Sequence, residues 1–324
     1  MLTAFVIEAG ICLLATAVLG KIFIPVLKSV KMGQKILDIG PRWHKSKEGT
    51  PTMGGLFFIV PVLIVGSVSA IRFHEPMLFV HLAFLMANGA IGFVDDYVKF
   101  FKKRNAGLTP SQKMILQFAA AAAYVFALKA MGQIDTALKL PFTDTVLELN
   151  IVVYCILAIV GIVFTVNSVN LTDGIDGLAS SVTAVVMIFM AALSFKTHNF
   201  AGMTVSMCIL GGTIGFLVYN FHPAKVFMGD TGSLFLGGAV SSMAFLLDCP
   251  LLLVFAGFVY YVESFSVIIQ VTGYKLTGKR VFKMSPIHHH FEMCGWSEIK
   301  IVTVFSVVAA IVCAVGSFGF LPVL

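Results

Sequence analysis

Ten long runs of apolar residues divide the sequence, and they constrain the fold more than any other feature. A helix needs about 20 apolar residues to cross a bilayer, and most of the runs are close to that length. A transmembrane strand is only about 10 residues long and alternates polar with apolar side chains, which these runs do not do. The runs therefore predict an all-α integral membrane protein with about ten transmembrane helices. They lie at 2–27, 54–71, 76–94, 114–131, 150–168, 178–195, 201–219, 233–247, 250–272 and 301–322.

The composition agrees with a membrane protein and excludes other classes. Hydrophobic residues make up 58% of the 324 residues and charged residues 12%, against about 45–50% and about 25% in soluble domains. A soluble enzyme, a disordered chain and a fibrous protein are excluded. The six cysteines are scattered without a CxxC pair, so no disulfide framework or zinc site is predicted. We expect residues 1–324 to form a single polytopic membrane domain.

The lysines and arginines predict the orientation in the membrane. Seventeen of the 22 fall in the first, third, seventh and ninth connections, and four fall in the connections on the opposite side. Basic connections face the cytoplasm in membrane proteins, so both termini are predicted to be extracytoplasmic. The net charge of +6 is then a topology signal, and no nucleic-acid partner is expected.

Acidic residues gather at the predicted cytoplasmic ends of the spans. Asp95 and Asp96 follow the third run, and two adjacent carboxylates there repel each other and are costly to desolvate. A divalent cation would relieve both problems, and Mg²⁺ commonly takes one or two carboxylates together with substrate phosphates. The alternative is an interfacial acid pair that is balanced by Lys99 and its basic neighbours.

A second polar block, at 170–177, follows the fifth run. Asn170, Asp173 and Asp176 are three residues apart, so on a helical path they would share one face. Gly174 and Gly177 allow a tight turn or a close backbone approach. A simple polar turn between two spans is the alternative.

Two later segments and one buried acid complete the polar features. The segment 220–233 contains Asp230 and also Phe227, either a stacking ring or an interfacial anchor. Three consecutive histidines at 288–290 cannot all point one way, so they predict phosphate contacts or a solvated loop rather than a zinc site. Glu263, inside the ninth run, has either a functional role or a structural one, pairing with a neighbouring helix or facing a cavity.

Together, four loops that carry acids or histidines are predicted to meet at one membrane face beside many lysines. Carboxylates that hold a divalent metal, lysines that meet phosphate oxygens and glycines that let backbone amides approach would explain this mixture. A site at the membrane face suggests one lipid substrate and one soluble phosphorylated substrate.

The segments 49–55, 95–99, 170–177, 229–233 and 286–290 occur in a familiar order and at familiar intervals. Through them the whole chain closely resembles the polyprenyl-phosphate N-acetylhexosamine-1-phosphate transferase superfamily. His44 with the 49–55 segment, and the triple histidine, resemble its phospho-N-acetylmuramoyl-pentapeptide-transferase branch. The resemblance implies Mg²⁺-dependent transfer of phospho-N-acetylmuramoyl-pentapeptide from UDP-MurNAc-pentapeptide to undecaprenyl phosphate, giving lipid I and UMP. It also implies a multi-pass protein of the bacterial inner (plasma) membrane, with cytoplasmic catalytic loops, that forms a homodimer.

The resemblance further implies roles for individual residues. Asp230 is the implied metal ligand, and Phe227 is the candidate ring that stacks on the nucleoside. The implied catalytic residues are Asp95, Asp96, Asp173, Asp230, Lys113 and His289. The implied substrate-binding residues are Lys47, Thr52, Asn170, Asp176, Asn220, Phe227, Gln270, His288 and His290.

For the reaction itself we favour direct attack by the lipid phosphate on the sugar-side phosphorus of the donor. The second pKa of a phosphomonoester is about 6, so the acceptor needs little activation at neutral pH. Asp95 would remove a residual proton, Asp96 would bind or position the metal, and Lys113 would offset phosphate charge. The competing scheme forms a phospho-aspartyl intermediate. A sister transferase that uses UDP-N-acetylglucosamine, and a transporter with charges near the bilayer midplane, are the other functions to test.

Overall fold

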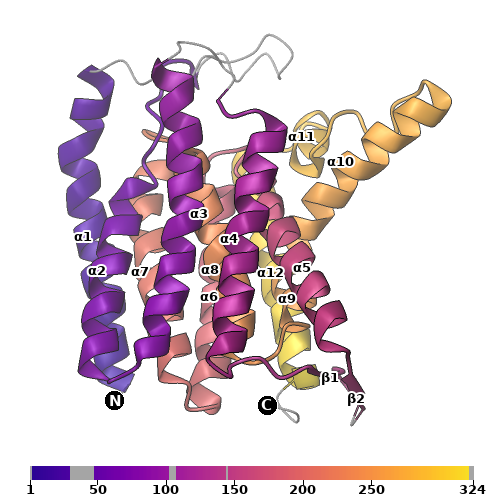
Figure 1. Ribbon diagram of the computed structural model, residues 1–324. Helices are drawn as coiled ribbons and strands as arrows, with labels where there is room; N and C mark the ends of the chain where they lie inside the picture. Colours follow the sequence, from indigo (N-terminus) through magenta and orange to yellow (C-terminus); the bar gives the residue numbers. More distant parts are fainter. Residues whose placement is uncertain (1, 30–46, 102–106, 144, 321–324) are drawn as a thin grey trace.

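The computed structural model describes residues 2–29, 47–101, 107–143 and 145–320 as a bundle of helices with one small hairpin (Figure 1). The strands β1 (Ala137–Lys139) and β2 (Val146–Glu148) pair antiparallel. The helices are α1 (Leu2–Ser29), α2 (Leu56–Arg72), α3 (Pro76–Phe101), α4 (Pro110–Ala130), α5 (Ile151–Thr172), α6 (Leu178–Lys196), α7 (Phe200–Asn220), α8 (Gly229–Leu246), α9 (Leu252–Ala256), α10 (Phe258–Thr277), α11 (Ile287–Glu292) and α12 (Glu298–Phe320).

Helices occupy all ten of the predicted apolar runs. Within the part of the chain that the structure describes, seven of them are long and apolar enough to cross a membrane: α1, α3, α4, α5, α6, α7 and α12. A shorter apolar helix, α2, has 17 residues. The prediction of an all-α membrane protein is thus confirmed, whereas a total of ten spans stays a prediction.

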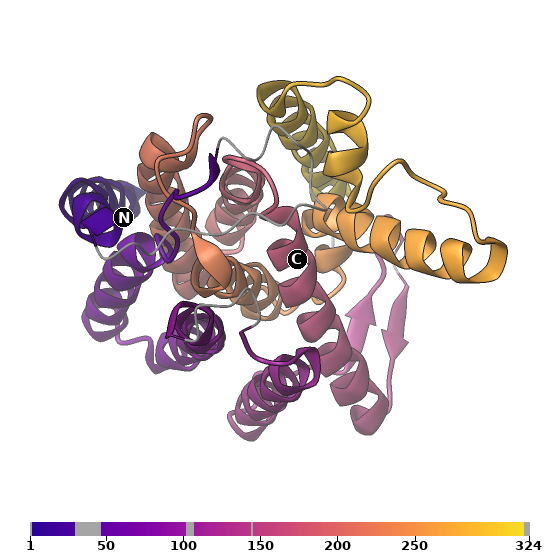
Figure 2. The same ribbon diagram turned by 90° about the horizontal axis from the view of Figure 1, so that it is seen from above.

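The ninth run is not one continuous helix, and this part of the prediction is wrong. The chain breaks between α9 and α10 at Gly257, where a Cβ atom would lie 2.5 Å from the carbonyl oxygen of Leu253 and 2.5 Å from the ring of Tyr261. Only glycine fits such a close approach. After the break, α10 runs away from the bundle (Figures 1 and 2).

The core of the bundle surrounds α8. Every residue of α8 from Thr231 to Phe245 is buried, which is typical of a helix enclosed on all sides. At its start α8 touches α3 directly, because a Cβ atom at Gly92 would lie 2.6 Å from the backbone nitrogen of Thr231. The two helices can therefore bring side chains from distant parts of the sequence together.

The two ends of the described chain share one end of the bundle. The start of α1 and the end of α12 both lie at the lower edge of Figure 1, as does the hairpin, whereas α3 ends at the upper edge. This arrangement agrees with an even number of crossings. Which end faces the cytoplasm stays a prediction from the basic residues.

Candidate active site

The site is built around the first turn of α8. Gly229 begins the helix with φ +70°, and a Cβ atom there would lie 2.8 Å from the hydroxyl of Thr52. The carboxylate of Asp96, from α3, accepts hydrogen bonds from the backbone nitrogens of Asp230 (3.2 Å) and Thr231 (2.9 Å) and from the Thr231 hydroxyl (2.7 Å). Free N–H groups and a positive dipole end favour a carboxylate at this position. Asp96 therefore holds the start of α8, and with it Asp230, in place.

Side chains from three helices converge on the carboxylate of Asp230. The Lys99 ammonium of α3 lies 3.0 Å from Asp230 and 2.6 Å from Asp95. The Lys113 ammonium of α4 lies 2.8 Å from Asp230. The amide of Asn170, near the end of α5, donates to Asp230 at 3.0 Å. The structure thus brings together five residues that are spread over 136 positions of the sequence.

The three carboxylates could hold a metal ion. One oxygen from each of Asp95, Asp96 and Asp230 lies within 4.8 Å of the others, and we call these residues the acidic cluster. The ammonium groups of Lys99 and Lys113 lie beside these carboxylates. An all-oxygen donor set fits a hard divalent cation. Because Asp96 is tied to backbone donors, Asp230 is the carboxylate best placed to bind an ion.

The protonation of Asp230 agrees with that role. Burial alone would raise the pKa of Asp230, but hydrogen bonding to Asp95 and the charges of Lys113 and Lys99 hold that pKa well below its usual range. Asp230 is therefore an anion in the folded protein. A permanently ionised carboxylate is available as a ligand without losing a proton first.

Asp173 lies close enough to the acidic cluster to be affected by it. The residue is partly buried and follows the last turn of α5. Burial, together with the negative charges of Asp230 and Asp96, raises the pKa of Asp173 well above its usual value. A partly buried carboxyl with a raised pKa near other acids is typical of functional sites.

A second group of charges lies around Lys47. Its ammonium lies 2.7 Å from Asp176 and 2.7 Å from Glu298, and the backbone nitrogen of Asp176 donates to Glu298 at 3.0 Å. The ring of His222 lies 3.2 Å from Asp176. We call these four residues the Lys47 cluster. Although three of them could also surround a metal ion, the lysine already supplies the cation between the two carboxylates.

The polar block 170–177 does not form one face. Because α5 ends at Thr172, Asn170 points to Asp230 whereas Asp176 points to Lys47. The expectation of a shared helical face is therefore wrong. The expected close approach at Gly174 is confirmed, since a Cβ atom there would lie 2.5 Å from Cε1 of His288.

The segment after Lys47 pairs with the connection between α7 and α8. Phe227 donates its backbone N–H to the carbonyl oxygen of Pro51 at 2.8 Å and accepts from Gly54 at 2.9 Å. The side chain of Asn220 is buried and donates to the carbonyl oxygen of Val226 at 3.0 Å. These bonds place Thr52 beside Gly229, leave the Phe227 ring partly buried and make Asn220 a support of this loop.

The three consecutive histidines have different partners, as their spacing requires. His288 has no exposed surface, and its Nδ1 lies 3.1 Å from the equally buried carboxylate of Glu263 on α10. Nδ1 of His289 lies 2.6 Å from Glu292, and Nδ1 of His290 accepts from the backbone nitrogen of Lys283 at 3.1 Å. The enclosure of His288 departs from the expected substrate contact and assigns it a supporting position. Of the two roles considered for Glu263, the contact with His288 on α11 favours the structural one, pairing with a neighbouring helix.

Gln270 also supports the histidine segment. Its side-chain oxygen accepts from the backbone nitrogens of Val281 (3.0 Å) and Phe282 (2.8 Å), and its amide donates to the carbonyl oxygen of Phe282 at 3.1 Å. These three bonds tie the segment that precedes α11 to α10. Gln270 thereby fixes the path of the chain toward the histidines.

Sequence reasoning missed several residues of the site. From the sequence alone, Lys99 has only the role of a counter-charge, although its spacing of four from Asp95 on a helix signals a side-chain pair. Glu298 lies 122 residues from its backbone partner Asp176, and no local pattern announces it. Glu292 pairs with His289 three residues away in α11, a local spacing that could have indicated it, whereas His222 meets Asp176 only through the fold.

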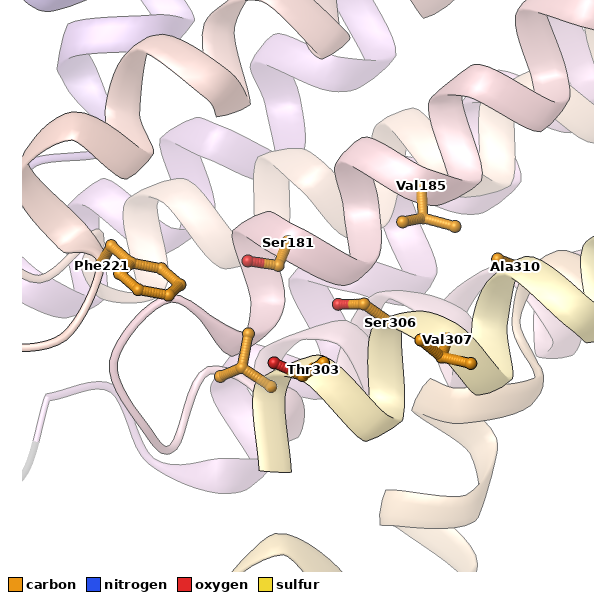
Figure 3. Close-up of a pocket in the computed structure, with 8 residues that line it drawn as sticks. Ser181, Val185, Phe221, Thr303, Ser306, Val307 and Ala310 are labelled. Carbon is orange, nitrogen blue, oxygen red and sulfur yellow. The ribbon is translucent and has the colours of Figure 1, made fainter. Parts of the chain in front are cut away.

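A mostly apolar groove lies apart from both clusters. It has a volume of about 400 Å³ between α6 and α12 and is lined by residues that include Ser181, Val185, Phe221, Ser306 and Ala310 (Figure 3). Among the residues that the structure describes, no acidic residue and none of the predicted site residues lines the groove. It is therefore separate from the candidate active site.

Comparison with known proteins links this geometry to a family. The model of Glycosyl transferase family 4 matches residues 77–248, which include the whole acidic cluster, and the phospho-N-acetylmuramoyl-pentapeptide-transferase signature 1 matches residues 47–59. A phospho-N-acetylmuramoyl-pentapeptide-transferase of Clostridium botulinum (strain Eklund 17B / Type B) is 50% identical over 301 residues, 92% of this chain and 91% of that one. Proteins of the same name from Clostridium beijerinckii and Bacillus cytotoxicus are 46% and 44% identical, over 94% and 96% of this chain and 92% and 96% of their own lengths.

Proposed function

The chain belongs to the phospho-N-acetylmuramoyl-pentapeptide-transferase family, and we propose that the acidic cluster is where it carries out the family's reaction. It transfers phospho-N-acetylmuramoyl-pentapeptide from UDP-MurNAc-pentapeptide to undecaprenyl phosphate, which yields lipid I and UMP in peptidoglycan synthesis. The observation that carries the placement is the convergence of Lys99, Lys113 and Asn170 on the ionised carboxylate of Asp230. Both substrates carry phosphates, and the site offers them ammonium groups next to a carboxylate that is proposed to hold a metal ion.

We propose Mg²⁺ as the cofactor, held by Asp230 with Asp95 beside it. The all-oxygen donor set of the acidic cluster and the ionised carboxylate of Asp230 support this assignment. When bound, Mg²⁺ would offset the charge of the donor diphosphate and of the departing UMP. Asp96 keeps its oxygens on the start of α8 and positions Asp230.

The protein's own contribution is to position two anions against their mutual repulsion. Lys113 and Lys99 sit beside Asp230 and would move partly onto substrate phosphates, which are the usual partners of such cations in phosphoryl transfer. An oxygen of the lipid phosphate would form a bond to the sugar-side phosphorus, and the bond from that phosphorus to the oxygen of UMP would break. Asp95 would accept the acceptor's residual proton, and Asp173 and His289 would lie near the reacting groups.

We assign the nucleoside end of the donor to the Lys47 cluster and Phe227. Lys47 is held by two carboxylates, which fixes its ammonium at the edge of the 47–55 segment. Since Asp176 is buried and paired, its proposed role is to orient Lys47. The donor would be contacted, or the loops that contact it supported, by Thr52, Asn220, Gln270 and His290. His288 is enclosed and would act only through its neighbours.

The chain is a multi-pass bacterial membrane protein. We propose that the end of the bundle that carries the acidic cluster faces the cytoplasm, because 17 of the 22 basic residues fall in connections on that side. The donor is soluble and the acceptor is a lipid, so a site at this membrane face would be open to both. A homodimer and a full count of ten spans belong to the same proposal.

A transfer assay with labelled UDP-MurNAc-pentapeptide and undecaprenyl phosphate, with and without Mg²⁺, tests these assignments. We expect Asp230→Asn to remain folded and to lose Mg²⁺-dependent turnover. The control is Glu148→Gln, an exposed residue of β2 at the other end of the bundle, which should retain turnover. Near-normal turnover of Asp230→Asn would refute the metal assignment. UMP release without acceptor, together with a labelled aspartate, would replace direct attack by a phospho-enzyme route. Preference for UDP-N-acetylglucosamine as donor would indicate the sister transferase.

A further inference from the structure

The second half of α10 has exposed apolar side chains that the described part of the chain leaves uncovered. After the helix leaves the bundle (Figures 1 and 2), side chains on successive turns are exposed. Leu276 is 81% exposed, more than any other large hydrophobic residue in the described part of the chain. Ile268, Ile269, Val271 and Tyr274 in this half of the helix are also exposed, as is Val281 just after its end. In a membrane protein such a surface needs lipid around it.

The same segment is strongly basic. Residues 264–291 contain no Asp or Glu but include Lys275, Lys279, Arg280 and Lys283. Lys275, Lys279 and Arg280 are exposed. Among the described residues neither Lys275 nor Lys279 has an ion-pair partner, and Arg280 bonds only to the carbonyl oxygen of Lys283 at 3.3 Å. The protein itself therefore does not neutralise these cations.

The projecting segment carries both apolar side chains and cations without an ion-pair partner among the described residues. These two kinds of side chain match the acyl-chain layer and the headgroup layer of a lipid leaflet. The far end of α10 lies at about the level at which α3 ends in Figure 1, where the acidic cluster places the membrane boundary. Four or more basic residues beside apolar helix surface are typical of segments that bind anionic headgroups. We propose that residues 268–283, which we call the α10 arm, form a docking surface for anionic phospholipids of the bilayer, with acyl chains on the apolar side chains and headgroup phosphates on Lys275, Lys279 and Arg280.

Docking would act on the catalytic end through contacts already described. Gln270 of α10 binds the backbone at Val281 and Phe282, and Glu263 of α10 binds His288. A lipid that fixes the direction of α10 therefore also fixes α11, which carries His289. This part of the inference rests on the proposed function, whereas lipid binding by the arm does not.

Direct lipid binding is the primary test. The full-length protein is placed in nanodiscs of phosphatidylcholine with a minor share of phosphatidylglycerol, and the enrichment of phosphatidylglycerol on the extracted protein is measured by native mass spectrometry. A cation near the membrane surface changes binding of anionic lipid by about fivefold. We expect the enrichment of phosphatidylglycerol on the triple variant Lys275→Gln, Lys279→Gln, Arg280→Gln to be at least tenfold lower than on the wild type. All three side chains are exposed, and an unchanged unfolding temperature in detergent verifies the fold.

The control removes three other cations, in the variant Lys129→Gln, Lys139→Gln, Lys196→Gln, from the end of the bundle that holds the termini. We expect it to keep the enrichment. Equal enrichment in the wild type and the arm variant would overturn the proposal, as would equal losses in the two variants.

A second arm of the test separates bulk phospholipid from the acceptor lipid, which shares its chemistry. In nanodiscs of pure phosphatidylcholine, the KM for undecaprenyl phosphate is compared between the wild type and the arm variant. We expect no change. A raised KM with unaltered phosphatidylglycerol binding would mean that the arm receives the acceptor, and the proposal would be wrong. Loss of turnover in every preparation, with lipid enrichment intact, would instead count against the proposed function alone.

Discussion

Replacing Gly174 by alanine tests whether the buried pair of His288 and Glu263 organises the catalytic end. Gly174 lies in the turn between α5 and α6, next to Asp173, and the imidazole of His288 packs directly against it. The backbone at Gly174 does not have positive φ, so alanine is compatible with the turn itself. Any effect of the substitution must come from the contact with His288.

The structure sets the size of the effect. The new Cβ atom would lie 2.5 Å from Cε1 of His288, whereas an ordinary contact is at least 3.4 Å, so the ring must retreat by about 1 Å. The 3.1 Å contact with Glu263 would then be lost. Overpacking at a buried site costs about 1–3 kcal/mol, and disturbing this contact, which has the distance of an ion pair but not the geometry of a hydrogen bond, adds to that cost. We expect the free energy of unfolding to fall by about 2–4 kcal/mol.

Turnover should fall as well, because His288 carries α11 and the turn carries Asp173. A displacement of about 1 Å in a catalytic group can cost about 100-fold in rate, so we expect a loss of at least tenfold. Thermal unfolding in detergent and the labelled transfer assay measure the two effects. The matched control is Gly161→Ala on α5, where a Cβ atom meets nothing within 4 Å and alanine favours the helix. If Gly174→Ala is as stable and active as Gly161→Ala, the reasoning is refuted.

Three further variants address the remaining assignments. Asp96→Asn turns one acceptor oxygen into a donor that faces the N–H of Thr231, so we expect unfolding to become easier by about 1.5–3 kcal/mol, and an unchanged melting temperature would contradict the capping role. Glu298→Gln removes one of the two carboxylates at Lys47. It should raise the KM for the UDP donor several-fold with little change in kcat, and a change confined to kcat would sink the nucleoside assignment. Because the pKa of Asp173 is raised, the folded protein keeps a proton that the unfolded chain releases above its ordinary pKa of about 3.9. Stability should therefore fall as the pH rises from that value toward the raised pKa, and Asp173→Asn should remove this slope in melting curves recorded against pH.

The sequence was most informative where the physical signal is local. Apolar runs of sufficient length must become helices in a bilayer, since unpaired backbone groups are costly there, and helices occupy all ten runs. The acids at the ends of the runs also lie together, as expected for carboxylates whose repulsion is offset by cations: Asp95, Asp96 and Asp230 form the acidic cluster, with Lys99 beside them. Charge and hydropathy thus predicted the bundle and the acidic cluster.

The parts that escaped prediction depend on contacts between distant segments. The break at Gly257 is an exception: the close approaches that demand glycine involve Leu253 and Tyr261, four residues away on either side, but a glycine inside an apolar run does not by itself predict a break. The pairing of Glu298 with Lys47, and the burial of His288 against Glu263, join residues whose neighbours look like ordinary loop or span sequence. Such pairings follow from how helices pack, which periodicity does not reveal.

The packing of α3 against α8 explains how the acidic cluster stays assembled without substrate. A Cβ atom at Gly92 would lie 2.6 Å from the backbone nitrogen of Thr231, so the two backbones touch about one turn before Asp96. At that separation the Asp96 carboxylate reaches the first N–H groups of α8, and the direction of Asp230 is set by main-chain bonds rather than by a flexible side chain. The lysines are held through their side chains, Lys99 by ion pairs and Lys113 by an ion pair and a 3.3 Å hydrogen bond to Asn170, so they can turn toward arriving phosphates without moving the backbone. Fixed carboxylates with movable cations are what phosphoryl transfer requires, since the charge to be stabilised develops on the substrate.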